Sequence, residues 1–188
     1  DLVKDTFPDK EFLTTPMKKE VDRCVLAFEE AMKGKVVSMI CSGDAGVYGM
    51  AGLMYEVGVN YPEVELEIVP GVTAALGGAA VLGAPLIHDF CLISLSDLLT
   101  PWEKIEARLL GASQADFVIC LYNPSSKKRH DYLQKACDLM MQYKSPDTVC
   151  GTVCNIGREG EEYHLMTLKE LRDTQVDMFT TVFIGNSQ

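Results

Sequence analysis

The sequence VVSMICSGDAGVYGMAG, residues Val36 to Gly52, decides the fold that we expect for this chain. Its first six residues are apolar and β-favouring apart from one serine, which is typical of a strand buried on both faces. Ser42, Gly43 and Asp44 break this run, and a helix rich in Ala, Leu and Met is expected from Val47 onward. A strand, a glycine-rich turn and a helix in this order predict an open α/β sheet, which binds ligands beyond the carboxyl ends of its strands.

The glycine spacing in this turn matches neither of the common phosphate-binding motifs. Gly43, Gly46 and Gly49 do not follow the dinucleotide fingerprint, and no Lys-Ser or Lys-Thr pair follows them as in a P-loop. Asp44 also argues against phosphate, because a carboxylate in the turn repels an anion. An acid here suits a ligand with hydroxyls, an ammonium or another cationic centre. A tight βα turn with an exposed Asp cap explains these residues equally well.

The composition is that of a globular protein and argues against several functional classes. The 188 residues leave room for one domain or two small ones, and 47% of them are apolar. The net charge of −10 argues against general binding to nucleic acids or to anionic membranes. No apolar run is long enough to cross a bilayer, and no signal peptide opens the chain. The seven scattered cysteines indicate a reducing cytoplasm, and the spacing of Cys and His predicts no metal site.

The first half of the chain reads as a parallel βαβ arrangement that ends at a join over residues 83–89. Helices are expected over 17–33 and 74–82, and strands over 36–41 and 65–69, around the central helix. In the first helix the spacing places Val21, Val25, Leu26 and Phe28 toward the core and Glu29, Glu30 and Lys33 outward. The helix over 74–82 consists of small residues, which suit close packing on a sheet or a close approach to a ligand.

The second half reads as a mixed α/β layer. Strands are expected over 90–95, 116–122, 148–155, 163–167 and 180–184. Helices are expected from Thr100-Pro101 and over 126–143. The polar loop 156–162 suits an antiparallel connection between its two flanking strands, so the second sheet is predicted to be mixed.

Four loops that follow predicted strands hold the residues best suited to binding. They are Ser42–Tyr48, Pro70–Ala74, Tyr122–Arg129 and Asn155–Arg158. The third loop places Lys127, Lys128 and Arg129 at a helix start, where cations oppose the helix dipole unless an anion is bound. A solvated basic turn is the alternative.

A polar cluster and one histidine are further candidates for binding or catalysis. Ser94, Asp97, Thr100 and the single tryptophan, Trp102, are close in sequence and could line a cleft. Helix capping by Thr100 with Trp102 in the core also explains these two residues. His88 has an acidic neighbour, although a lone histidine of this kind is more often structural. No pattern typical of hydrolytic catalysis is present in the sequence.

The chain resembles the tetrapyrrole (corrin/porphyrin) methylase family through five segments in order. They are SGDAGVYGMAGL, EIVPGVTAALGGAAVLGAPL, HDFCLISLSDLLTPW, CLYNPSSKKR and TTVFIGNS. Within the family they are most similar to the branch that methylates carbon 17 of precorrin-3B or cobalt-precorrin-3 and contracts the ring in cobalamin synthesis. Methylation at another carbon is one alternative, and a non-catalytic ligand-binding or dimerisation module is another.

The resemblance implies S-adenosylmethionine as cofactor and assigns residues by position. The cofactor-binding residues would be Ser42, Gly43, Asp44, Val47, Thr73, Ala74, Tyr122, Asn123, Asn155 and Gly157. The residues toward the tetrapyrrole substrate would be Ser94, Asp97, Thr100, Lys127, Lys128 and Arg129. The resemblance assigns no residue to proton transfer, and the sequence offers His88, Asp97 and Lys127 as candidates, in that order.

The resemblance also implies an architecture of two α/β halves, residues 1–87 and 88–188. The first would hold a parallel sheet, the second a mixed sheet, and a ligand cleft would lie between them. A cytoplasmic homodimer is expected. Family members begin with a strand and a GxGPG-type loop that have no counterpart in this sequence. The first half is therefore expected to be truncated, and Val36–Cys41 to lack one parallel neighbour.

Overall fold

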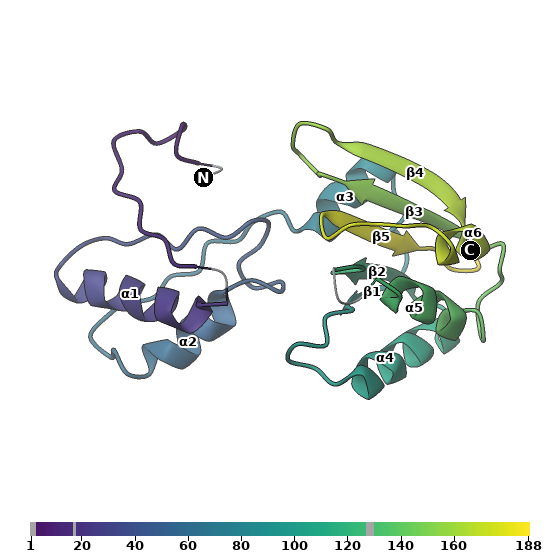
Figure 1. Cartoon of the computed structure of the whole chain (residues 1–188), viewed down its shortest axis with the longest axis horizontal. Coiled ribbons are helices and arrows are strands. Elements are labelled where there is room, and N and C mark those ends of the chain that lie inside the picture. Colours follow the sequence, from purple (N-terminus) through teal and green to yellow (C-terminus); the bar gives the residue numbers. More distant parts are fainter. Residues whose placement is uncertain (1–2, 17, 127–129) are drawn as a thin grey trace. The chain divides into compact units, whose positions relative to one another are not determined.

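The computed structural model describes residues 3–16, 18–126 and 130–188. The chain divides into two compact units, Asp1–Thr73 and Ala74–Gln188, and each is described here by itself (Figure 1).

The second unit is built on a five-stranded mixed sheet. Its strands are β1 (Phe90–Ser94), β2 (Val118–Tyr122), β3 (Val149–Cys154), β4 (Glu162–Thr167) and β5 (Thr180–Ile184), in the spatial order β1-β2-β5-β3-β4 (Figure 1). β1 and β2 are parallel, whereas β2 with β5, β5 with β3 and β3 with β4 are antiparallel. The mixed sheet predicted for this half is confirmed, because the sheet contains both parallel and antiparallel strand pairs.

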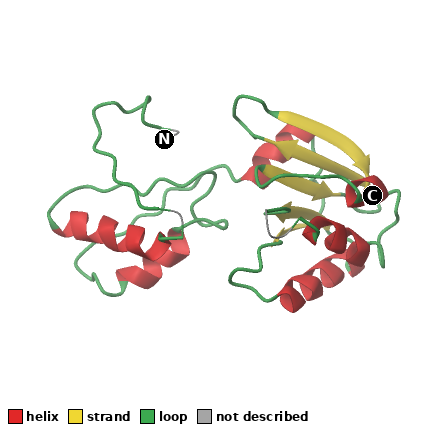
Figure 2. Ribbon diagram, viewed as in Figure 1, coloured by secondary structure: helices red, strands yellow, loops and turns green. Residues whose placement is uncertain are grey.

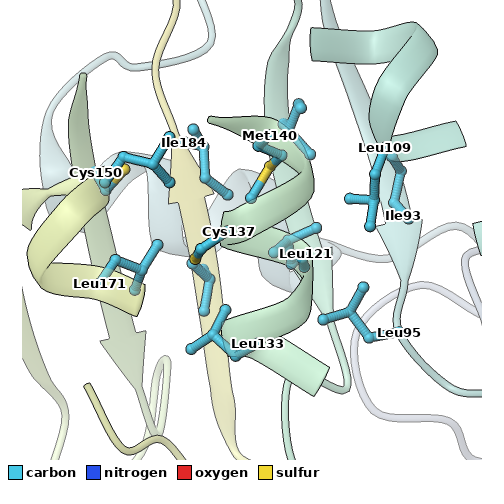
Figure 3. Close-up of a cluster of buried hydrophobic side chains, with 14 of the residues drawn as sticks. Ile93, Leu95, Leu109, Leu121, Leu133, Cys137, Met140, Cys150, Leu171 and Ile184 are labelled. Atoms are coloured by element: carbon cyan, nitrogen blue, oxygen red, sulfur yellow. The ribbon is translucent and has the colours of Figure 1, made fainter. Parts of the chain in front are cut away.

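Helices cover both faces of this sheet. α4 (Trp102–Gln114), α5 (Tyr132–Met140) and α6 (Leu168–Arg172) pack on one face. Their buried side chains form a core with alternate sheet residues such as Leu121 and Ile184 (Figure 3). Burying each large aliphatic side chain of this kind contributes roughly 1.5–3 kcal/mol, so this cluster is the main source of the unit's stability.

The other face of the sheet is covered by α3 (Ala74–Leu82). Ala75 and Ala79 pack against Cys120, Val153 and Phe183, which alternate along their strands with the residues facing the first core. The boundary between the two compact units therefore falls between Thr73 and Ala74 in the sequence, whereas the resemblance placed it between residues 87 and 88. The reason is that α3 buries its small residues on the second sheet.

The first unit is built around two helices, α1 (Glu20–Met32) and α2 (Ala51–Gly58), which pack against each other (Figure 1). Their core contains Cys24, Phe28, Met54 and Val57, and the Phe28 ring stacks on Tyr61 with ring centroids 4.9 Å apart. Val21, predicted to face this core, is 53% exposed.

The parallel sheet predicted for the first half is wrong for the residues that the structure describes. Residues 36–41 and 65–69 are extended but have no strand assignment, and no described residue before Phe90 belongs to a strand (Figure 2). Val36 is fully exposed and Ile40 is 61% exposed, so the run predicted to be buried on both faces is open to solvent. A β-favouring sequence forms a strand only where a neighbouring strand pairs with its backbone.

Two further details of the first unit differ from expectation. α2 begins at Ala51 rather than Val47, because Tyr48 has a φ of 52° and the Ala51 N–H donates back to the Ala45 carbonyl. Glu30, predicted to point outward, is only 9% exposed and pairs with Lys35 at 2.6 Å and also with Lys33.

No helix within the described ranges is long and apolar enough to cross a membrane. Among those same residues no group of three His, Cys, Asp or Glu side chains is arranged to hold a metal ion.

Candidate cofactor and substrate site

The carboxyl ends of β1 and β2 bring two predicted site residues together. Because the strands are parallel and Ser94 pairs in register with Tyr122, both strands end at the same edge of the sheet. The residue after β2, Asn123, has a φ of 53° and donates from Nδ2 to the Ser94 Oγ at 2.9 Å. The Ser94 Oγ also accepts from the Ser96 N–H at 3.2 Å, so this hydroxyl joins the two strand-end loops.

Tyr122 links this edge to the start of α3. Its hydroxyl accepts a hydrogen bond from the Ala75 N–H at 2.8 Å, one of the first-turn amides of the helix that have no partner within the helix. The predicted residues Ala74, Tyr122 and Asn123 are therefore neighbours, although Ala74 and Tyr122 lie far apart in the sequence.

The loop after β3 forms a compact turn on the same sheet edge. Asn155 has a φ of 51° and Gly157 a φ of 70°, and the Asn155 Nδ2 donates to the Gly160 carbonyl at 3.3 Å. The Gly157 N–H donates to a Glu161 carboxylate oxygen at 2.6 Å. Glu161 is not among the predicted site residues, because its position in a polar loop gives no sign of this backbone contact.

Ile156 fixes this loop to α3. Its side chain packs on the glycines of the helix: a Cβ added at Gly77 would come within 2.9 Å of Ile156, and one at Gly78 within 3.0 Å of Ile156 and 2.8 Å of Phe183. Tight helix–sheet packing therefore explains the small residues of this helix. It also holds the loops after β2 and β3 close to the helix N-terminus.

Within the first unit, a second group of predicted site residues is centred on Asp44. One carboxylate oxygen accepts from the Gly46 N–H at 2.8 Å, and the other accepts from the Gly71 N–H at 2.9 Å. These backbone hydrogen bonds, from Gly71 first and then Gly46, hold the pKa of the Asp44 carboxyl below its usual range. The loop over 42–48 and the loop over 70–73 are thus joined by one side chain.

The other predicted cofactor residues of this unit lie in the same two loops. Ser42 and Gly43 are exposed, Val47 is half-buried, and Thr73 is only 7% exposed. The Val47 N–H donates to the Asp44 carbonyl at 3.3 Å, which closes the turn.

The substrate residues predicted between β1 and α4 form an anchored loop. The Asp97 Oδ2 accepts from the Tyr132 hydroxyl at 2.7 Å, and the Tyr132 ring packs on Trp102 with centroids 4.5 Å apart. Between these anchors Leu98 is 75% exposed and Leu99 97% exposed. The two exposed leucines give the loop an apolar tip. Neither this tip nor Tyr132 is among the predicted site residues, and Tyr132 belongs to a helix distant in sequence.

Capping of α4 by Thr100 is not found, because Pro101 occupies the N-cap and no side-chain cap is formed. Trp102 is partly buried against the core, as the alternative reading predicted.

One candidate for proton transfer, His88, does not lie at this edge of the sheet. His88 is exposed and precedes β1, so it lies at the opposite end of this strand from Ser94. At roughly 3.3 Å per residue the strand separates the two by more than a side chain's reach. Lys127, Lys128 and Arg129 lie outside the described residues.

The family model described as "Tetrapyrrole (Corrin/Porphyrin) Methylases" matches residues 1–172. The chain belongs to this family. The family resemblance inferred from the five sequence segments is confirmed.

Curated relatives match the chain along nearly its whole length. It is 50% identical to a probable cobalt-factor III C(17)-methyltransferase of Salmonella typhimurium, over 98% of this chain and 77% of the relative. It is 42% identical to the precorrin-3B C(17)-methyltransferase of Sinorhizobium sp, over 96% of this chain and 73% of that protein. A cobalt-factor III methyltransferase of Priestia megaterium is longer: the chain, 45% identical to it, spans 36% of its length.

Two solved structures are similar in fold to this chain. The methyltransferase CobJ has a TM-score of 0.85 at 36% identity, over 92% of this chain and 74% of that chain. A uroporphyrin-III C-methyltransferase of Thermus thermophilus, solved with S-adenosyl homocysteine, has a TM-score of 0.68 over 89% of this chain and 74% of that chain. At 20% identity, it supports the fold alone.

Proposed function

We propose that this chain is an S-adenosylmethionine-dependent methyltransferase that methylates carbon 17 of precorrin-3B or cobalt-factor III in cobalamin synthesis. The observation that carries this proposal is the 50% identity, over 98% of the chain, to a relative named for this reaction. The TM-score of 0.85 to CobJ at 36% identity supports it, because the likeness in fold covers 92% of this chain.

The chemistry of the strand-end loops fits the cofactor. S-adenosylmethionine carries an amino acid group, a ribose and an adenine, and each needs hydrogen-bond partners at short range. The loops offer backbone groups, hydroxyls and amides, and glycines where the chain must come close. The residues proposed to form the cofactor site, either by direct contact or by holding its loops in place, are Ser42, Gly43, Asp44, Val47, Thr73, Ala74, Tyr122, Asn123, Asn155 and Gly157.

The protein's contribution to methyl transfer is mainly alignment. When bound, S-adenosylmethionine would supply a methyl group on a positively charged sulfonium sulfur; a nucleophilic carbon of the macrocycle would attack that methyl in line, and S-adenosylhomocysteine would be the leaving group. Holding donor and acceptor in this geometry is worth roughly 7–11 kcal/mol at best. The loops after β1, β2 and β3 are suited to this task, because hydrogen bonds within and between them fix their conformations.

For the macrocycle we propose the anchored loop between β1 and α4. Its apolar tip, Leu98 and Leu99, would pack against a ring face, and Ser94 and Thr100 would lie toward the ring edge. Asp97 is the favoured candidate for proton transfer during ring contraction, because its carboxylate is held by the Tyr132 hydroxyl at this sheet edge. Lys127, Lys128 and Arg129 remain the proposed partners of the substrate carboxylates.

Two experiments test the proposal. Calorimetric titration with S-adenosylhomocysteine should give saturable binding, and ATP should not bind, because Asp44 disfavours a phosphate. Incubation with precorrin-3B or cobalt-factor III and S-adenosylmethionine labelled in its methyl group should then give a product that carries one added methyl group. The label should be found at carbon 17 of that product. Methylation at another carbon would indicate a different member of the family, and cofactor binding without turnover would indicate a non-catalytic binding module. A homodimer and a cytoplasmic location remain proposals, and sedimentation of the purified chain tests the first.

A further inference from the structure

The Asp44 carboxylate joins two separate loops of the first unit. Its Oδ1 accepts from Gly46 within its own turn at 2.8 Å, and its Oδ2 accepts from Gly71 in the following loop at 2.9 Å. Both acceptors are thus engaged by backbone N–H groups. Hydrogen bonds to a charged acceptor are stronger than neutral ones, so this side chain is an effective connector.

The contact between the loops is close enough to require glycine. A Cβ added at Gly71 would lie 2.1 Å from the Gly43 carbonyl oxygen and 3.4 Å from the Asp44 Cα. The nearest obstacle is backbone, which cannot rotate away as a long side chain can. Any other residue at position 71 would therefore push the two loops apart and lengthen the Asp44–Gly71 hydrogen bond.

From these contacts we infer that Asp44 is a positioning residue: it clasps the 42–48 loop to the 70–73 loop and so sets the cofactor-binding backbone. The inference rests on the proposed function and deepens it. It differs from a direct role, in which the carboxylate would pair with the ammonium or sulfonium of the cofactor. If Asp44 is a positioning residue (the clasp model), Asp44 and Gly71 affect cofactor binding through the same hydrogen bond. If Asp44 pairs with the cofactor itself (the direct model), the two residues affect binding independently.

A double-mutant cycle distinguishes the two models. Asp44→Asn leaves one acceptor oxygen and turns an amide toward a backbone donor, while Gly71→Ala separates the loops and keeps the carboxylate. We expect each single variant to weaken S-adenosylhomocysteine binding about tenfold. The double variant should bind no more weakly than either single one, because both changes remove the same contact. Gly52→Ala is the matched control, because a Cβ there meets nothing within 4 Å.

Hydrogen–deuterium exchange without ligand supplies an independent measurement. In Asp44→Asn the segment containing Gly71 should exchange faster, and in Gly52→Ala it should not change. A roughly hundredfold loss in the double variant would overturn the clasp, and so would full affinity in Gly71→Ala or unchanged exchange in Asp44→Asn. If the unmutated chain binds no S-adenosylhomocysteine, the proposed function is wrong, and the clasp then has no role in cofactor binding. The exchange experiment, which uses no ligand, still decides whether Asp44 holds the two loops together.

Discussion

Replacing Gly78 by alanine tests how α3 supports the candidate site. Gly78 is buried in the middle of this helix, and an added Cβ would lie 2.8 Å and 2.9 Å from two atoms of the Phe183 ring and 3.0 Å from Ile156. Phe183 is only 2% exposed and packs in the core with Ala75 and Ala79, so its ring cannot turn out into solvent without losing these contacts. The added methyl group therefore has to displace α3 or the loop after β3.

The expected change in the free energy of unfolding of Gly78→Ala follows from two opposing contributions. Alanine is the better helix former by about 1 kcal/mol, whereas overpacking a dense core costs about 1–3 kcal/mol. Gly111→Ala isolates the first term, because Gly111 is exposed within α4 and its added Cβ would meet nothing within 4 Å. We expect Gly111→Ala to stabilise the second unit by about 1 kcal/mol, and Gly78→Ala to be less stable than Gly111→Ala by about 1–3 kcal/mol.

Urea denaturation followed by tryptophan fluorescence measures this difference. Trp102 is the single tryptophan and packs against the core of the second unit, so its signal reports the unfolding of that unit. Cofactor affinity should also fall in Gly78→Ala, because Ile156 carries the Asn155–Gly157 loop. If the two variants are equally stable, α3 is not packed tightly against Phe183 and the account of this helix is refuted.

Three further predictions follow from other parts of the molecule. Leu98→Ser combined with Leu99→Ser should raise the KM for the corrin substrate roughly tenfold, because apolar contact with the macrocycle is lost; equal loss of S-adenosylhomocysteine affinity would contradict this role. Two lysines lower the pKa of Glu30 from 4.5 to about 2, so the carboxylate stabilises the first unit above pH 4.5 and progressively less as the pH falls toward 2. The stability difference between the unmutated chain and Glu30→Gln, followed by far-UV circular dichroism, should therefore shrink over that interval; a constant difference would exclude this ion pair as its source. In hydrogen–deuterium exchange the Val36–Cys41 amides should exchange much faster than those of β5, and equal protection would mean that this run is paired.

The sequence predicted the second unit well because its strands satisfy their hydrogen bonds within the chain. The segments predicted to be strands in this half became β1, β2, β3, β4 and β5, with ends displaced by only a residue or two. The same kind of run at Val36–Cys41 did not form a strand. Apolar, β-favouring residues specify extended backbone, but pairing depends on a neighbour, and none of the described residues pairs with this run.

By itself, the sequence determined the family, the strand-end positions of Tyr122, Asn123 and Asn155, and the glycine-rich turn around Asp44. These are local properties, because they depend on residue type and on spacing along the chain. Only the tertiary structure decided which side chains meet: Asp44 with Gly71, Asp97 with the hydroxyl of Tyr132, and Ile156 with the glycines of α3. Such contacts join residues distant in sequence, and packing and backbone hydrogen bonding select them from many partners that the sequence alone leaves equally available.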